Sequence, residues 1–200
     1  MRAVVSIGIA AALAAACGAG GGERTVNRPA ATETACAAAP SATVRLDHVP
    51  IAVRDLEGAT ADYRDRLGFA IKPGRPHPNS ILNSHQKFRD GTQLELITAT
   101  EPRDRLARDY LDFLTGGDGG AFLALHAGRA DSASARVKAV EPEHEAADGE
   151  YGTPGFAPGH PLRYLFFANG PASPTDRPEH FAHPNTAAGL HAVWIRRADP

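Results

Sequence analysis

The amino-acid sequence predicts an α+β fold in which one small unit, a strand, a helix and three further strands, is present twice. Two observations predict this class. Apolar residues alternate with polar ones in short stretches, as in strands, and recur every third or fourth residue between them, as in helices. In both halves an aspartate, Asp55 or Asp131, follows a strand and is placed to cap the next helix. This recurrence indicates an internal duplication, whose second copy is atypical.

Module one begins with a strand at residues 44–53, after which Asp55 caps a helix from Leu56 to Leu67 that ends at Gly68. Three further strands complete the unit, and an Asp-Gly turn joins the last two. These strands are expected at residues 69–72, 80–88 and 93–98.

The two faces of these strands differ in character. Because side chains alternate between the faces of a strand, Val49 and Ile51 share one face while His48 points to the other. In the last strand the same alternation separates Glu95 from Leu94 and its apolar neighbours. We therefore expect His48 and Glu95 on the face that does not pack against the helix.

The second half of the chain starts with a connecting helix over residues 102–114, opened by Pro102, with Leu106, Tyr110 and Leu114 facing inward. Module two is then expected to hold a strand at 121–127, a helix from Asp131 to Val140, a loop at 141–161, and strands at 162–168 and 190–196. His183-Pro-Asn repeats His77-Pro-Asn, which favours the last strand as part of module two. The alternative is that this strand begins a third module that the chain does not finish.

Composition excludes several classes of protein. The 200 residues carry 21 basic and 23 acidic side chains and a net charge of −2, so nothing indicates nucleic-acid binding. Two cysteines are too few for a disulfide framework or for a zinc site built from paired cysteines.

The amino terminus resembles a bacterial lipoprotein signal. Met1 and Arg2 precede an uncharged stretch, residues 3–16, which is too short to cross a bilayer and suits a signal peptide. Small residues lead into Cys17, the residue that such a signal would lipidate. We expect export, a signal at 1–17, and membrane attachment through this lipid anchor only. The alternative is ordinary cleavage, which would release a soluble secreted or periplasmic protein.

Residues 18–43 contain hardly any large apolar side chain and are expected to form a disordered tether. The tether includes Cys36, which is either free or paired between molecules if Cys17 is lipidated. The globular domain at 44–200 comprises module one at 44–99, the connecting helix at 102–114 and module two at 121–197.

Several motifs, taken in order, resemble the vicinal oxygen chelate superfamily and within it the glyoxalase-like subgroup. They are Leu46-Asp-His-Val49, Leu67-Gly-Phe69, Pro76-His-Pro-Asn79 with Asn83, and the stretch from Lys87 to Leu96. The resemblance is good over about 44–130 and weak from 141 onward. It implies two β-α-β-β-β modules whose sheet curls into a half-open barrel around a cleft.

The resemblance also implies a divalent metal, Mn, Fe, Ni, Co or Zn, with ligands from the first and fourth strands of each module. In module one these positions are His48 and Glu95; the alternative is that the two side chains pair with each other. Counting from Asp131 places Ala124, which cannot bind a metal, at the first position in module two. His126 is therefore the third candidate ligand, and the alternative reading makes it a histidine of the core or the rim.

A loop of module one offers candidate substrate-binding residues. Arg75, His77, Asn79 and Asn83 are expected to line the cleft and to hold a carbonyl or carboxylate group. The alternative for His77-Pro-Asn is plain turn chemistry. Three other histidines are expected in polar loops without a role: His144, His160 and His180.

Three functions follow from these observations. A metal-dependent lyase, isomerase or dioxygenase would use the metal as a Lewis acid, with Glu95 as ligand and catalytic base. Glyoxalase I itself conflicts with export, because its thiol cofactor is cytosolic. The alternative is a protein that binds or sequesters a small oxygen-rich molecule without turnover, as resistance proteins of the superfamily do, and the third is a scaffold whose cleft has lost its chemistry. A homodimer is one candidate assembly.

Overall fold

The computed structural model describes residues 44–146, 154–156, 160–170 and 172–194. The predicted signal and tether, with Cys17 and Cys36, lie outside the described residues. Within the described part of the chain, no helix is both long and apolar enough to cross a membrane.

Module one is the predicted β-α-β-β-β unit. Its elements are β1 (Arg45–Ala52), α1 (Leu56–Ala61), which continues as the wider π-helical turn η1 (Asp62–Arg66), β2 (Lys72–Pro73), β3 (Ile81–Lys87) and β4 (Gln93–Ala99). The Asp55 carboxylate accepts the Gly58 N–H at 2.9 Å and caps α1. Gly68, at a φ of 71°, lets the chain leave the helix. The strand predicted at 69–72 is shorter because the Ala70 N–H donates to His183 rather than to a neighbouring strand.

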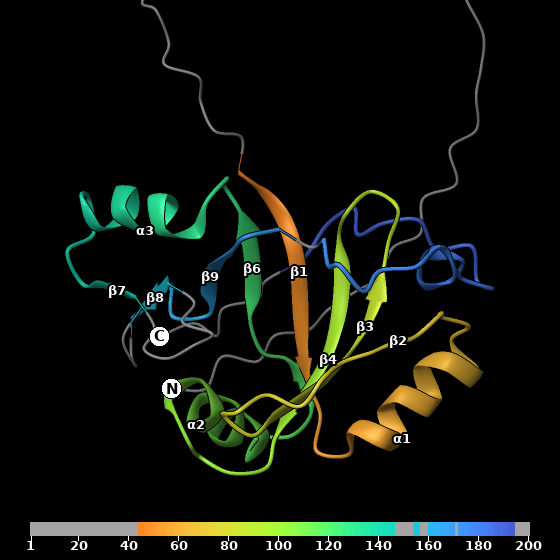
Figure 1. The fold of residues 1–200 in the computed structure, drawn as a ribbon. Coiled ribbons are helices and arrows are strands. Elements are labelled where there is room, and N and C mark those ends of the chain that lie inside the picture. Colours follow the sequence, from red (N-terminus) through yellow and green to blue (C-terminus); the bar gives the residue numbers. More distant parts are fainter. Residues whose placement is uncertain (1–43, 147–153, 157–159, 171, 195–200) are drawn as a thin grey trace, which may run out of the picture.

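The sheet is open and has the strand order β2-β3-β4-β1-β6-β9 (Figure 1). β1 runs parallel to β4 and antiparallel to β6 (Leu123–His126), which in turn runs parallel to β9 (Leu165–Ala168). The short β5 (Gly119–Gly120) also pairs with β1. The α+β class and the duplicated unit are confirmed, and the β1–β6 pair joins the two modules.

Module two repeats the order of module one more closely than the sequence predicted. It runs β6, α3 (Ala130–Lys138), β7 (His144–Ala146), β8 (Pro154–Phe156) and β9. The region predicted as a loop at 141–161 therefore holds two short strands, which pair with each other in a separate two-stranded sheet. They escape detection because they are only three residues long and lie among Gly, Pro and acidic residues.

Two predicted helix starts differ from the structure. α2 (Arg105–Leu114) begins after Asp104, whose carboxylate accepts the Ala107 N–H at 2.8 Å, and not at Pro102. α3 begins after Arg129, and the predicted cap Asp131 lies within its first turn, paired with Arg129. Pro102 and Asp131 thus predicted that a helix follows, but each gave a wrong position for the first residue of the helix.

The predicted strand at 190–196 is not a strand over the part that is described, 190–194. Residues 172–194, which include the 3-10 helix η2 (Pro178–Phe181), instead pack on module one. His183 accepts the Ala70 N–H and donates to the Lys87 carbonyl, both at 2.9 Å. Its ring also lies against Phe69 and Phe88. The repeated His-Pro-Asn motif therefore marks an anchor here and not a second copy of the His77 loop.

The same segment carries Asp176 to two buried lysines. Its two carboxylate oxygens each accept a hydrogen bond of 2.6 Å, one from Lys72 and one from Lys87. These bonds lower the pKa of Asp176 to about 2, although its burial alone would raise it. This ion-paired cluster fixes the segment to β2 and β3.

The core consists of two clusters on opposite faces of the sheet. One contains Val49 and Leu94 with Phe69 and Phe88. The other lies under α2 and contains Ile81, Ile97, Tyr110 and Phe122 among its buried residues. His48 and Glu95 lie on the α2 face, so the predicted separation of polar and apolar faces is confirmed.

Candidate binding site

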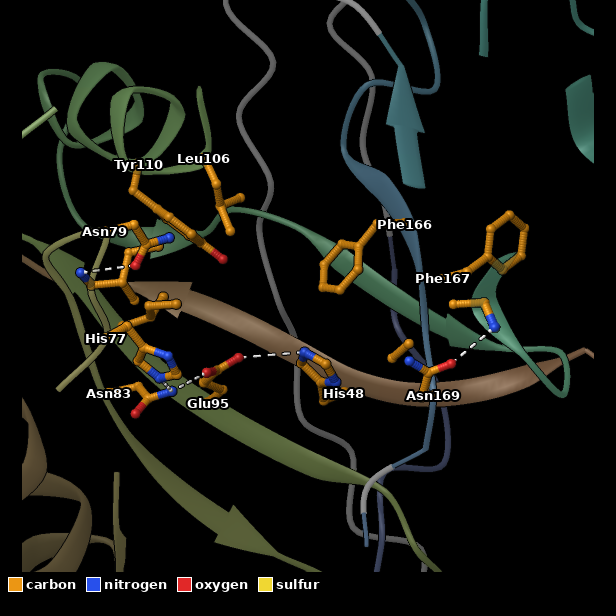
Figure 2. A pocket seen from close by; sticks show the side chains of 14 residues that line it. His48, His77, Asn79, Asn83, Glu95, Leu106, Tyr110, Phe166, Phe167 and Asn169 are labelled. Atoms are coloured by element: carbon orange, nitrogen blue, oxygen red, sulfur yellow. Dashed lines mark hydrogen bonds and ion pairs between the residues drawn. The ribbon is translucent and has the colours of Figure 1, made fainter. Parts of the chain in front are cut away.

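A cavity of about 350 Å³ lies on the α2 face of the sheet, where the two modules meet. Module one supplies its polar side chains: His48, His77, Asn79, Asn83 and Glu95. Module two supplies Ala130, Phe166, Phe167, Ala168 and Asn169, and α2 adds Leu106 and Tyr110. Figure 2 shows His77, Asn79, Asn83 and Glu95 on one side of this space and the two phenylalanines on the other, with His48 next to Phe166. The size is at the small end of the range for small-molecule sites.

His48 is held at both ring nitrogens. Its Nδ1 lies 2.6 Å from an oxygen of Asp47, and its Nε2 lies 3.3 Å from Oε2 of Glu95. The ring also meets Phe166 edge to face, with 5.4 Å between the ring centres. His48 on β1 and Glu95 on β4 come together because these strands are neighbours with parallel register.

This arrangement keeps both partners charged. Burial alone would lower the pKa of His48, but its hydrogen bonds to Asp47 and Glu95 outweigh that effect and raise it to about 9. Burial would raise the pKa of Glu95, but the bond and charge of His48 lower it to about 2. At neutral pH the pair is therefore an imidazolium beside a carboxylate.

The remaining polar residues support Glu95. Asn83 donates a 2.6 Å hydrogen bond to its other oxygen, Oε1, and lies 3.5 Å from Nε2 of His77. Asn79 donates to Asp104, the capping residue of α2, at 2.9 Å. Three of the four predicted residues, His77, Asn79 and Asn83, therefore line the cavity, and Asn79 also ties its loop to α2.

Strand register identifies which residues of module two correspond to His48 and Glu95. In module one, Glu95 pairs with Pro50, two residues after His48. In module two, Ala168 pairs with His126, two residues after Ala124. His48 and Ala124 pair directly across the module junction, as a twofold relation requires. The equivalents of His48 and Glu95 are therefore Ala124 and Ala168, which have no side chain able to bind a metal or move a proton.

The donor set does not fit a divalent metal. Of the four corresponding positions only two carry a side chain with a donor atom, His48 and Glu95, because Ala124 and Ala168 offer none. In the described part of the chain, no three His, Cys, Asp or Glu side chains converge to hold a metal ion. The described residues favour the alternative in which His48 and Glu95 pair with each other.

Two predicted site residues lie outside the cavity. His126 is not among the lining residues, and its Nδ1 lies 3.3 Å from the carbonyl of Ala168, so it is a rim residue. Arg75 is exposed and does not line the cavity. His144, predicted in a polar loop, is buried on β7 with its Nε2 2.7 Å from the Ser134 hydroxyl.

Sequence reasoning missed every apolar residue of the site and several polar ones, and three examples show why. Asp47 is adjacent to His48, and alternation along a strand predicts that neighbours point apart. Tyr110 was expected only as a core residue of the apolar stripe on α2, and no signal separated it from Leu106. Phe166 lies in a strand that was predicted, but its position beside His48 depends on the β1–β6–β9 order.

The open mixed sheet, the duplicated β-α-β-β-β unit and the cavity between the modules define the vicinal oxygen chelate fold. Residues 46–200 match the glyoxalase-like domain family, and the chain belongs to that family. No curated protein matches the chain.

Among solved structures, the chain is similar to a hypothetical protein from Bacillus halodurans C-125, with 16% identity and a TM-score of 0.49 over 62% of this chain and 91% of that one. It is also similar to a methylmalonyl-CoA epimerase in complex with methylmalonyl-CoA and an ammonium ion. The identity is 20% and the TM-score 0.47, over 66% of this chain and 99% of the epimerase. For the methylmalonyl-CoA epimerase from Mycobacterium tuberculosis the identity is 24% and the TM-score 0.45, over 64% of this chain and 88% of that enzyme.

Proposed function

We propose that this glyoxalase-like domain binds a small oxygen-bearing molecule in the cavity at His48 and Glu95, with no metal between protein and ligand. The observation that carries the proposal is the buried His48–Glu95 ion pair facing an apolar wall from the other module. An oxygen of the ligand would accept from His48 Nε2–H, or a hydroxyl would donate to Glu95. The rest of the molecule would lie against Phe166 and Phe167.

The charge states favour binding over proton abstraction. His48, with a pKa of about 9, is already protonated at neutral pH, and Glu95, with a pKa of about 2, is a weak base. Each residue holds the other in its charged form. A ligand that enters between them would replace one charge-assisted hydrogen bond by another.

An isomerase-type proton transfer is the second candidate function. It is favoured by the 2.6 Å contact between Asp47 and His48, because a carboxylate on Nδ1 orients the other nitrogen toward the cavity. Turnover would require the ligand to separate His48 from Glu95, which would return the pKa of each group toward its ordinary value. A site of this kind would show activity that depends on both residues.

The test is a binding screen of 2-oxoaldehydes, diols and catechols against the purified chain, by thermal shift and then calorimetry. His48→Ala and Glu95→Gln should abolish binding, while His191→Ala, an exposed residue outside the cavity, should leave it unchanged. Conversion of any bound compound, followed by NMR, separates the isomerase from the binding protein. Stoichiometric Mn, Fe, Ni, Co or Zn in the chain, lost in both site variants, would contradict the metal-free site.

We also propose that the chain is exported and anchored by a lipid on Cys17. The support is the sequence at residues 1–17. Cys17→Ser should move the protein from the membrane fraction of the cell to the soluble fraction. Unchanged partitioning would contradict the anchor.

A further inference from the structure

The cavity holds one polar group that the proposed function does not use, the hydroxyl of Tyr110. Tyr110 is only 2% exposed, and its ring packs edge to face on Phe122 at 5.1 Å. In Figure 2 its oxygen points into the cavity, toward the space between Glu95 and Phe166. Among the described residues, none forms a hydrogen bond with this hydroxyl.

The Tyr110 hydroxyl is not one of the described polar atoms that are fully buried without a partner, so its oxygen is open to the cavity and available to a bound molecule. Tyr110 does not provide a negative charge, because burial, and next the charge of Glu95, raise the pKa of its phenol well above 10. At any physiological pH the group is therefore a neutral hydrogen-bond donor. The bound molecule is the partner that the cavity leaves room for.

The charges around the cavity restrict that molecule further. The described residues that line the cavity include no lysine or arginine, and both ring nitrogens of His48 already face carboxylates, Asp47 and Glu95. A ligand carboxylate or phosphate would add a third negative charge beside one imidazolium. Desolvating that anion without a new cation is unfavourable.

We propose that Tyr110 recognises the ligand by donating a hydrogen bond to a carbonyl oxygen, and that the ligand is an uncharged carbonyl compound with a flat unsaturated body. The flat body fits the apolar wall that Phe166 and Phe167 form on one side of the cavity. This inference rests on the proposed function, since it assigns a ligand class to the same cavity. It adds a recognition residue outside the His48–Glu95 pair.

Three probes of matched shape test it: 2-acetylnaphthalene, which has a carbonyl acceptor, 2-isopropylnaphthalene, which has none, and 2-naphthoate, which is an anion. Binding to the full chain is measured by equilibrium dialysis at pH 7.5. The ketone should bind about three- to tenfold more tightly than the hydrocarbon, the range expected for one hydrogen bond. The anion should bind more weakly than either.

Tyr110→Phe should reduce the affinity for the ketone to that for the hydrocarbon and leave the hydrocarbon unchanged. Because the hydroxyl has no protein partner, this variant should be at least as stable as the wild type. Tyr164→Phe is the matched control, since Tyr164 packs on the same Phe122 but does not line the cavity. It should preserve the preference for the ketone.

The outcomes are distinguishable. If the ketone binds and Tyr110→Phe keeps the full preference, the role of Tyr110 is wrong while the cavity remains a binding site. If 2-naphthoate binds most tightly, the uncharged class is wrong. If Tyr110→Phe lowers stability by as much as the loss of a buried hydrogen bond, the hydroxyl serves the fold. If no probe binds, this inference fails, while the proposed function is still decided by its own screen of 2-oxoaldehydes, diols and catechols.

Discussion

The two modules share one topology but contribute side chains of different chemistry to the cavity. Module one supplies both charged groups and two amides together with Ile81 and Ile97, whereas module two supplies phenylalanine and alanine with a single amide, Asn169. At the two positions that correspond by strand register, His48 faces Ala124 and Glu95 matches Ala168. The duplication has thus preserved the strand order while the chemistry is confined to one copy.

This difference shows that pairing order and side-chain chemistry are constrained separately. The β6–β9 pair keeps its parallel register with alanine at the equivalent of a site position, because register depends on the apolar faces and the backbone. A cavity built this way has a polar end and an apolar end, which orients an amphipathic small molecule. This asymmetry should appear in the free energy of unfolding and in the binding affinity when residues of either module are replaced.

The largest effect is expected from removing the charge of module one. His48→Ala leaves Asp47 and Glu95 buried without their cation and should lower the free energy of unfolding by about 3–5 kcal/mol at pH 7. Urea denaturation measures the loss. Adding Glu95→Ala should recover part of it, because one of the unpaired carboxylates is removed. A loss below about 1 kcal/mol would mean that the pair contributes nothing to the fold.

The pH dependence of stability should report the same pair. The pKa of His48 is raised from 6.5 to about 9, so its contribution is complete below pH 6.5 and is lost as pH rises through 9, by about 3 kcal/mol. The pKa of Glu95 is lowered from 4.5 to about 2, so its contribution is complete above pH 4.5 and is lost as pH falls toward 2.

Stability should therefore be highest between about pH 4.5 and 6.5. Denaturation from pH 5 to 9.5 checks this, and Glu95→Gln should flatten the alkaline decline without abolishing it, since Asp47 remains. A wild-type profile that stays level up to pH 9 would contradict the ion pair.

Giving module two a site residue should sharpen the comparison. Ala168→Glu places another carboxylate in the cavity that Glu95 already lines, and should destabilise the chain by about 1–3 kcal/mol. It also supplies a third donor beside His48 and Glu95, so Zn or Ni should raise the melting temperature of this variant and not of the wild type. Ala168→Gln, of the same size without charge, should respond to neither metal.

The smallest effect is expected at the apolar wall. Phe166→Leu keeps an apolar surface but removes the edge-to-face contact with His48, and should cost about 1 kcal/mol of stability. The ketone and hydrocarbon probes should both bind more weakly by a similar factor. A loss confined to the ketone would show that Phe166 acts through the polar end, and the two-ended description would then be wrong.

The sequence was sufficient for the polar half of the site and insufficient for the rest. Alternation placed His48 and Glu95 on one face, and the parallel β1–β4 pair of the duplicated unit brought them together. Local patterns carry that information because the two strands belong to one module. His126 was assigned to the site from spacing alone and lies at the rim, since the twofold relation places Ala124 and Ala168 at the equivalent positions.

The described part of the carboxyl-terminal region shows more clearly what local sequence patterns cannot predict. Leu190 and its alternating neighbours predicted a strand, yet they pack against module one from a segment without regular structure. Long-range anchors decide this: His183 bonds to the backbone of residues 70 and 87, and Asp176 bonds to Lys72 and Lys87. Neither partner can be read from the local sequence, because more than eighty residues separate the bonded groups.

The Asp176 contacts also impose an order on biosynthesis. A nascent chain emerges from the ribosome with Lys72 and Lys87 long before residue 176, so during that interval the two ammonium groups have no carboxylate from this segment to enter a buried position with. They would stay hydrated, and the β2–β3 end of module one would remain open. The β2–β3 end of module one therefore reaches its final packing only after residue 176 has been synthesised, although both strands precede that residue by more than eighty positions.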